Sequence, residues 1–435
     1  MEFVAKDVAK NVGGFPSAGS GVVAGQTWTK QLCNDPSCNI DHSNEGWNVE
    51  GGPDGSKETD SEAFVAPIDR IVTPLDWLSA AFDQSMVSNH TSDTSTTAAA
   101  GGGGGSSGGD KEGGEKEEAW RPKEGEKFIY IVGTRGVKVT RISNELDYLA
   151  PSLESLTLRS NLLSSMQGVE NLVQLTHLEL YDNQIESLSH LDQLSKLTIL
   201  DMSFNAIREM SPVACCPLLT ELYIAQNKLR KIEGISEMKH LKILDLGANR
   251  IRSMSNCGLD KLINLESLWL GKNKIEAIDG VNALPKLEKL DVQHNRLLSI
   301  DNAIVHNDVE GKEGDEGVDA ALQGITGLKS LRQLYLASNS ITNVKGLPLE
   351  SKLECIDLTS NKISNLDGIE VHKELGDLWL TSNEIENMAQ IQALTLLPEL
   401  ASLYLEHCPI SKALTYKEDV KALLPNLIEL DGRSL

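Results

Sequence analysis

The chain has 435 residues, with 63 acidic against 40 basic side chains and a formal net charge of −23 at pH 7. This charge argues against nucleic acid and anionic membranes as main partners, because phosphate binding needs clustered Lys and Arg. A partner protein with a basic surface would complement this acidic chain better. The sequence has no run of 18 apolar residues and no apolar segment after Met1, so neither a membrane span nor a secretory signal is expected. The seven scattered cysteines favour a reduced, intracellular compartment.

Residues 1–126 are predicted to be a mostly disordered N-terminal extension. Thr94–Glu118 runs from Ser/Thr/Ala through Gly/Ser to Lys/Glu, which is typical of a flexible linker. The apolar residues of Ile68–Phe82 have two interpretations: isolated apolar side chains in a disordered segment, or a short helix that docks on a partner. The pattern Cys33-x4-Cys38-x3-His42 fits no common zinc spacing, so no metal site and no cofactor are predicted.

Apolar residues return from Phe128, and we predict that residues 127–150 cap the open end of a repeat array. Terminal repeats need such a cap because one face of their core has no neighbour. The far end is predicted to be closed by a second cap at residues 408–435. There Tyr416–Val420 resembles a short amphipathic helix, and Leu424–Asp431 a last strand-like turn.

Between the caps, an asparagine recurs with a period of 22 residues that is interrupted only three times. The positions are Asn161, Asn183, Asn205, Asn227, Asn249, Asn273, Asn295, Asn339, Asn361 and Asn383, followed by Cys408. Around each lies L-x-x-L-x-L-x-x-N-x-I/L, the leucine-rich-repeat consensus. Leucines two apart share one side of a strand, and the Asn side chain can bond backbone groups at the following turn. The fold class predicted for residues 151–407 is therefore an α/β solenoid of about eleven repeats with a concave parallel sheet.

One departure from the period is large. The spacing from Asn295 to Asn339 carries 22 extra residues, and an acidic insertion is predicted at residues 301–322. Extra residues must go to the turns or the convex side, and this segment is typical of a solvated acidic loop. We expect it to interrupt the stack midway along the concave face.

The residue between the two strand leucines should face the concave side of the sheet. In chain order this concave column contains Thr157, Glu179, Asp201, Tyr223, Asp245, Trp269, Asp291, Tyr335, Asp357, Trp379 and Tyr404. Five of these residues are acids and five are aromatic. Aromatic residues favour strands in general, and Asp is common in this slot, so a solvated sheet face is one interpretation. Exposed Trp at two strand centres is more typical of an interface, and we predict a binding surface.

The repeats resemble those of the leucine-rich-repeat regulatory subunit of type 1 protein serine/threonine phosphatase. The similar stretches are Leu178-Glu179-Leu180-Tyr181-Asp182-Asn183-Gln184-Ile185, Leu200-Asp201-Met202-Ser203-Phe204-Asn205, Leu268-Trp269-Leu270-Gly271-Lys272-Asn273-Lys274-Ile275 and Tyr404-Leu405-Glu406. The resemblance covers roughly residues 145–435. It implies a non-catalytic subunit of nucleus and cytoplasm, monomeric by itself, that grips the phosphatase catalytic subunit in its concave face. A second inhibitory subunit and metal-deficient phosphatase are further partners that the resemblance implies.

The resemblance also implies which side chains make the contact. Carried over by matching motif, they are Asp201, Tyr223, Asp245, Trp269, Asp357, Asp377, Trp379 and Tyr404. Seven of the eight belong to the concave column, and Asp377 enters only through the resemblance. The other column residues Glu179, Asp291 and Tyr335 are predicted as additional partner-binding positions.

The sequence does not favour an enzyme. No Walker-type loop, H-E-x-x-H or G-x-S-x-G motif is present, and His177, His294 and His407 lie in distant repeats. The alternative hypothesis is a leucine-rich-repeat scaffold for ciliary or cytoskeletal assembly. The two differ in partner: a phosphatase for the first, tubulin or dynein components for the second.

Overall fold

The computed structural model describes residues 122–134, 138–142, 144–301 and 324–435. Three predictions fall outside these ranges: the extension with its segment at 68–82, the Cys33/Cys38/His42 pattern, and the acidic insertion beyond residue 301. All described residues belong to one compact unit of the chain.

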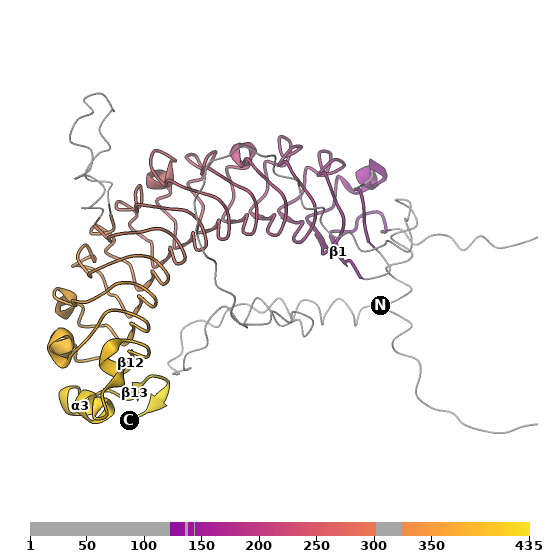
Figure 1. The fold of residues 1–435 in the computed structure, drawn as a ribbon. Coiled ribbons are helices and arrows are strands. Elements are labelled where there is room, and N and C mark those ends of the chain that lie inside the picture. The colour runs from indigo at the N-terminus through magenta and orange to yellow at the C-terminus, as the bar shows by residue number, and fades with distance from the viewer. Residues whose placement is uncertain (1–121, 135–137, 143, 302–323) are drawn as a thin grey trace, which may run out of the picture. The chain divides into compact units, whose positions relative to one another are not determined.

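A single 14-stranded sheet runs through the described residues, and strand order follows chain order. The strands are β1 (Phe128–Val132), β2 (Ser155–Arg159), β3 (His177–Glu179), β4 (Ile199–Asp201), β5 (Glu221–Tyr223), β6 (Ile243–Asp245), β7 (Ser267–Trp269), β8 (Lys289–Asp291), β9 (Gln333–Tyr335), β10 (Cys355–Asp357), β11 (Asp377–Trp379), β12 (Ser402–Tyr404), β13 (Glu429–Leu430) and β14 (Arg433–Ser434). Neighbours from β1 to β13 are parallel, and β14 turns back antiparallel to β13. Figure 1 shows the strands along the inner side of the curved stack, which confirms the predicted solenoid.

Short helices lie in the segments that connect the strands. They are the 3-10 helices η2 (Asn144–Leu149), η3 (Ser211–Cys215), η4 (Leu259–Lys261), η6 (Ile369–Val371), η7 (Met388–Leu396) and η8 (Pro409–Lys412), and the α-helix α3 (Tyr416–Leu423). The core lies between the sheet and these segments, where the consensus leucines of each repeat are fully buried, as Leu265, Leu268 and Leu270 are. One continuous apolar cluster therefore joins all the repeats.

The repeat asparagines tie each turn of the solenoid to the turn before it. The Leu229 amide donates to Asn249 Oδ1 at 3.0 Å, and Asn249 Nδ2 donates to the carbonyls of Ile224 at 2.8 Å and Leu246 at 3.0 Å. The same bonds recur at the other repeat asparagines, for example Asn183 and Asn361. Each Asn satisfies backbone groups that would otherwise be buried without partners, which is why the turn requires this side chain.

In the last repeat, the sulfur of Cys408 makes hydrogen bonds to the preceding turn, as the Asn side chain does elsewhere. Its Sγ accepts from the Asn383 amide at 3.3 Å and donates to the Leu380 carbonyl at 3.1 Å. A thiol combines a weak donor with a weak acceptor, so it can substitute for the amide at the end of the ladder.

The acidic insertion does not interrupt the sheet, contrary to the expectation from sequence. Strand β8 pairs directly with β9, and Asp291 lies in register with Tyr335. The described residues resume at Gly324, whose φ of 69° matches the left-handed glycine at the same turn of other repeats, such as Gly280 at 74°. This turn follows the strand and the repeat Asn, so the strand pairing is complete before the insertion begins in the sequence.

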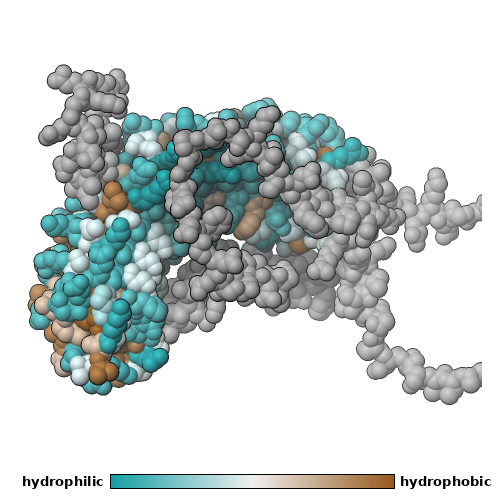
Figure 2. Space-filling view, in the orientation of Figure 1, coloured by the Kyte–Doolittle hydropathy of each residue, from teal (hydrophilic) through white to brown (hydrophobic). Residues whose placement is uncertain are grey.

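The two ends of the sheet are closed by different elements. At the first end, β1 pairs with β2 over five residues and η2 follows it. At the last end, α3 buries Tyr416 and Val420 against the final repeats. Figure 2 shows a largely hydrophilic visible surface on the solenoid, with hydrophobic residues gathered near the C-terminal end, where Leu414 and Ile428 are exposed.

The asparagine ladder predicts a large loss of stability on truncation. Asn249→Ala leaves the buried Leu229 amide unpaired and removes the shorter of the two amide donors to the Ile224 carbonyl, which keeps Asn227 Nδ2 at 3.3 Å. The free energy of unfolding should therefore fall by about 2–4 kcal/mol. Urea denaturation followed by circular dichroism measures this. Asn365→Ala, the same change at an exposed loop asparagine, is the control and should cost less than about 1 kcal/mol. Equal losses in the two variants would contradict the account.

Candidate functional site

The concave column forms one unbroken line across the sheet. Each member is the in-register partner of the next, from Thr157 beside Glu179 to Trp379 beside Tyr404. From Asp201 to Trp379 the column alternates strictly between an aspartate and an aromatic side chain. With neighbouring strands roughly 4.8 Å apart, the carboxylates recur about every 10 Å.

The column is less exposed than the sequence suggested. Trp269 and Trp379, expected to be exposed, are half-buried, and Thr157 is only 5% exposed. The cause is the strand spacing: an aromatic ring between two neighbours is partly covered by them. Thr157 therefore contributes little surface, and the described column effectively begins at Glu179.

Each of the four column aspartates makes the same local hydrogen bond. Its Oδ1 accepts the backbone amide two residues on, at 2.9 Å in every case; the amides belong to Ser203, Gly247, Gln293 and Thr359. This bond explains how Asp is tolerated in a strand, where it is otherwise disfavoured. In Asp291 the second oxygen also accepts from Gln293 Nε2 at 2.9 Å.

Burial makes these carboxylates unusually reluctant to ionise. Desolvation is the first cause, and neighbouring column acids add to it; together they raise the pKa of Asp245 and of Asp291 to about 6. Desolvation likewise raises the pKa of Asp201, Asp357 and Asp377. A cation placed beside this row of partly desolvated carboxylates would stabilise their ionised form.

The aromatic members are held by contacts on the same face. The rings of Trp379 and Tyr404 meet edge to face with centroids 6.3 Å apart, and Lys289 Nζ lies 6.0 Å from the Trp269 centroid. The Tyr223 hydroxyl donates to Glu221 at 2.8 Å, and desolvation followed by this bond raises the pKa of Tyr223. These contacts fix the ring orientations before any partner arrives.

Small residues flank the column two positions on in the central repeats: Ser203, Ala225, Gly247, Gly271, Ala337, Thr359 and Thr381. At two of them size is restricted by the aspartates. A Cβ at Gly247 would lie 3.1 Å from Asp245 Oδ1, and one at Gly271 3.0 Å from Asp291 Oδ1. A larger residue at either position would crowd the carboxylate beside it.

Two predicted residues differ from the rest. Glu179 is already paired inside the protein, with Arg159 Nε at 3.0 Å and His177 Nε2 at 3.8 Å. Asp377 lies one column over, in register with Cys355 and Ser402. Glu179 is thus the acid least available to a partner, whereas Asp377 extends the acidic face beside Trp379.

The comparisons with known proteins agree on the repeat. The family model described as "Leucine rich repeat" matches residues 239–297, and the one described as "Leucine Rich repeats (2 copies)" matches residues 173–215. These matches show that the chain carries leucine-rich repeats. No curated protein matches it in a sequence search.

Solved structures support the same fold. A leucine-rich-repeat protein of Leptospira interrogans is 25% identical with a TM-score of 0.52, over 68% of this chain and 76% of that one. A TDR receptor is 22% identical with a TM-score of 0.50, over 65% of this chain and 47% of that one. Both likenesses concern the solenoid fold.

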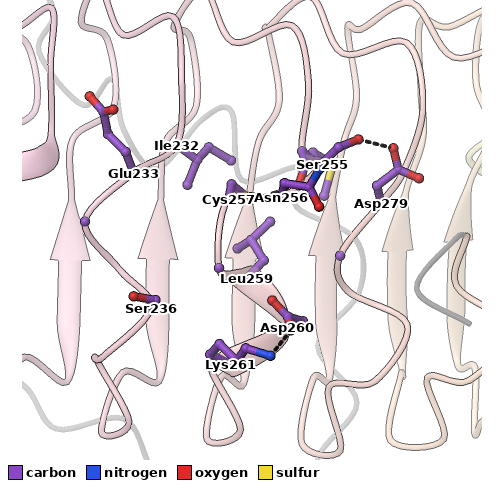
Figure 3. A pocket seen from close by; sticks show the side chains of 14 residues that line it. Ile232, Glu233, Ser236, Ser255, Asn256, Cys257, Leu259, Asp260, Lys261 and Asp279 are labelled. Atoms are coloured by element: carbon purple, nitrogen blue, oxygen red, sulfur yellow. Dashed lines mark hydrogen bonds and ion pairs between the residues drawn. The ribbon is translucent and has the colours of Figure 1, made fainter. Parts of the chain in front are cut away.

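A cavity of about 620 Å³ lies in the turns of the solenoid and not on the concave face. Figure 3 shows its lining side chains on the connecting segments, where Ser255 bonds Asp279 at 2.7 Å and Lys261 pairs with Asp260 at 2.6 Å. Two pairs of its polar side chains thus bond one another. Within the described ranges, no group of three or more His, Cys, Asp or Glu is placed to hold a metal ion. No helix in that part of the chain is long and apolar enough to cross a membrane.

Sequence reasoning missed two parts of the concave face. Tyr130 of β1 pairs with Thr157 and so extends the column by one strand. Arg159, Tyr181 and Phe204 form a stacked cluster beside it. The alternation Phe128-x-Tyr130-x-Val132 is the signal that would have revealed the first part; the second depends on contacts between neighbouring repeats.

The raised carboxyl pKa values predict a trade-off between stability and charge. A folded pKa of about 6 for Asp245 against 3.8 ordinarily means that the ionised carboxylate costs stability at pH 7, and that this cost disappears as pH falls through 6 towards 4. Asp245→Asn keeps an acceptor for the Gly247 amide and removes the charge. It should raise the free energy of unfolding at pH 7 by about 1–2 kcal/mol, with the gain vanishing near pH 4.

Chemical denaturation across this pH range measures the effect. Glu384→Gln, at an exposed loop position, is the control and should change stability little at any pH. A less stable Asp245→Asn variant at pH 7 would show that the charge supports the fold and is not a cost to it.

Proposed function

We propose that this protein is a non-catalytic regulatory subunit that binds the catalytic subunit of type 1 protein serine/threonine phosphatase along its concave face. The observation that carries the proposal is the strict alternation of aspartate and aromatic side chains from Asp201 to Trp379. The resemblance of the repeats and C-terminal end to that family of subunits supports it. In this role the protein acts in nucleus and cytoplasm and is a monomer before it meets its partner.

The aromatic side chains supply the apolar anchors. Trp269, Trp379, Tyr223 and Tyr404 are half-buried, with their rings already oriented, so little side-chain entropy is lost on binding. Trp and Tyr in such positions are enriched among residues that dominate binding energy. The small flanking residues leave space for the partner's side chains beside each ring.

The aspartates supply register and charge complementarity. A partner would pair with Asp201, Asp245 and Asp357 through Arg or Lys side chains about 10 Å apart for the first two and about 20 Å apart for the last two. Such pairing lowers the pKa of Asp245 and Asp291 from about 6, so complex formation releases protons below neutral pH. Glu179 contributes less, since Arg159 already neutralises it.

Truncating the anchors should weaken binding far more than it weakens the fold. In calorimetry of the full chain against purified catalytic subunit, we expect one-to-one binding that Trp269→Ala and Trp379→Ala each weaken by about 30-fold or more. Because these rings are half-buried, a stability loss of about 1–2 kcal/mol accompanies the change, and circular dichroism checks that the fold persists. Leu349→Ala, at a loop residue that is 69% exposed, should bind like wild type.

The titration is run with metal-loaded and with metal-free phosphatase. Tighter binding to the metal-free form supports the storage role that the resemblance implies. No binding to either form would contradict the proposal and favour a scaffold for ciliary or cytoskeletal assembly, tested next against tubulin.

A further inference from the structure

Phe204 occupies a backbone position that the other repeats give to different residue types. The residue before each repeat Asn, and before Cys408 in the last repeat, has a left-handed backbone with φ between 51° and 63°. These residues are Ser160, Asp182, Phe204, Gln226, Ala248, Lys272, His294, Ser338, Ser360, Ser382 and His407. Left-handed backbone is disfavoured for L-residues and is an outlier for a bulky one. Phe204 alone in this set is a large apolar residue, and it is 39% exposed. The fold needs the conformation but not the phenyl ring.

The exposed ring belongs to an ordered stack. The centroids of Phe204 and Tyr181 are 4.9 Å apart, and the guanidinium carbon of Arg159 lies 4.5 Å from the Tyr181 centroid. Arg159 is itself held by Glu179 at 3.0 Å. The stack thus joins three successive repeats, and the charge of Arg159 is balanced by Glu179.

Strand β1 continues this surface to the end of the sheet. Its concave-facing side chains Phe128, Tyr130 and Val132 are 64%, 63% and 44% exposed, far more than the half-buried rings of the column. Val132 lies in register with Arg159, and Tyr130 with Thr157. The remaining exposed large apolar residues of the described chain lie off the strands, in connecting segments and at the C-terminal end: Tyr148, Val173, Leu218, Ile263, Leu298, Leu349, Val371, Leu396, Leu414 and Ile428.

We propose that Phe128, Tyr130, Val132, Tyr181 and Phe204, here called the N-terminal aromatic patch, form a second anchor site for the protein that the concave column binds. It takes an apolar segment of that partner. This inference rests on the proposed function, and it adds a chemically distinct contact at one end of the groove.

Two features favour an apolar segment of the same partner as the group that binds to the patch. The patch adjoins the column, because Tyr130 is in register with Thr157 and Thr157 with Glu179, so one partner surface can cover both. The charge differs between the two regions: within the described residues no ion pair involves the column aspartates from Asp201 onward, whereas Arg159 neutralises Glu179 beside the patch. A partner with an apolar segment beside a basic surface would match both regions, and in only one orientation along the sheet.

Phe204→Ser tests the patch with little risk to the fold. Serine stands at the same left-handed position in Ser338, Ser360 and Ser382, so relief of backbone strain offsets loss of the ring stack. We expect an unchanged thermal midpoint, within about 3 °C, and about a tenfold weaker Kd for the phosphatase catalytic subunit by calorimetry of the full chain. Tyr130→Ser, at the other end of the patch, should weaken binding similarly. Leu349→Ser, an equally polar change off the concave face, should leave Kd unchanged.

Trp269→Ala is titrated in parallel to separate the two proposals. If it weakens binding while Phe204→Ser and Tyr130→Ser match wild type, the patch is overturned and the column stands. If the wild-type chain binds no phosphatase, both proposals fall. If the patch instead holds a second copy of this chain, sedimentation would show a wild-type dimer that Tyr130→Ser dissociates, and this too overturns the proposal.

Discussion

The structure depends on one hydrogen-bonded side chain repeated every 22 residues. Each repeat Asn accepts from the preceding turn and donates to carbonyls of two turns, so it sets the offset between neighbouring strands as well as closing its own turn. A shift of one residue would expose the leucines and bury the column, because side chains alternate along a strand. The register of the concave column is therefore a consequence of the asparagine ladder, and it persists across the insertion between Asn295 and Asn339.

That register lowers the stability of the fold at neutral pH. Once the strands are aligned, aspartates on alternate strands must lie about 10 Å apart between aromatic rings that restrict water. Asp245 and Asp291 then titrate near pH 6, and the fold bears the cost of ionising them at neutral pH. Asn could also accept the backbone bond that each Asp makes, without the charge. The charge is thus better explained by what a cation would gain from it than by the stability of the solenoid.

Much of this was predictable from sequence because the signal is periodic. The Asn period and the L-x-L spacing specify the parallel sheet, its concave side and the residues that line it. The properties that the sequence did not predict depend on which residues become neighbours in space. The half-burial of Trp269, the neutralisation of Glu179 by Arg159, and the stack of Tyr181 on Phe204 all involve residues about 20 positions apart. Strand β1 was anticipated only as a cap, since it lacks the consensus that identifies the other strands.

We expect a partner to bind on the concave face and not on the convex turns. Hydroxyl-radical footprinting of the full chain, with and without the phosphatase catalytic subunit, tests this claim directly. Oxidation of Tyr223, Trp269, Tyr335 and Trp379 should fall sharply in the complex, while that of the exposed loop residues Leu349 and Val371 should not change. Protection of the loop residues with the column still oxidised would place the partner on the other side and contradict the account.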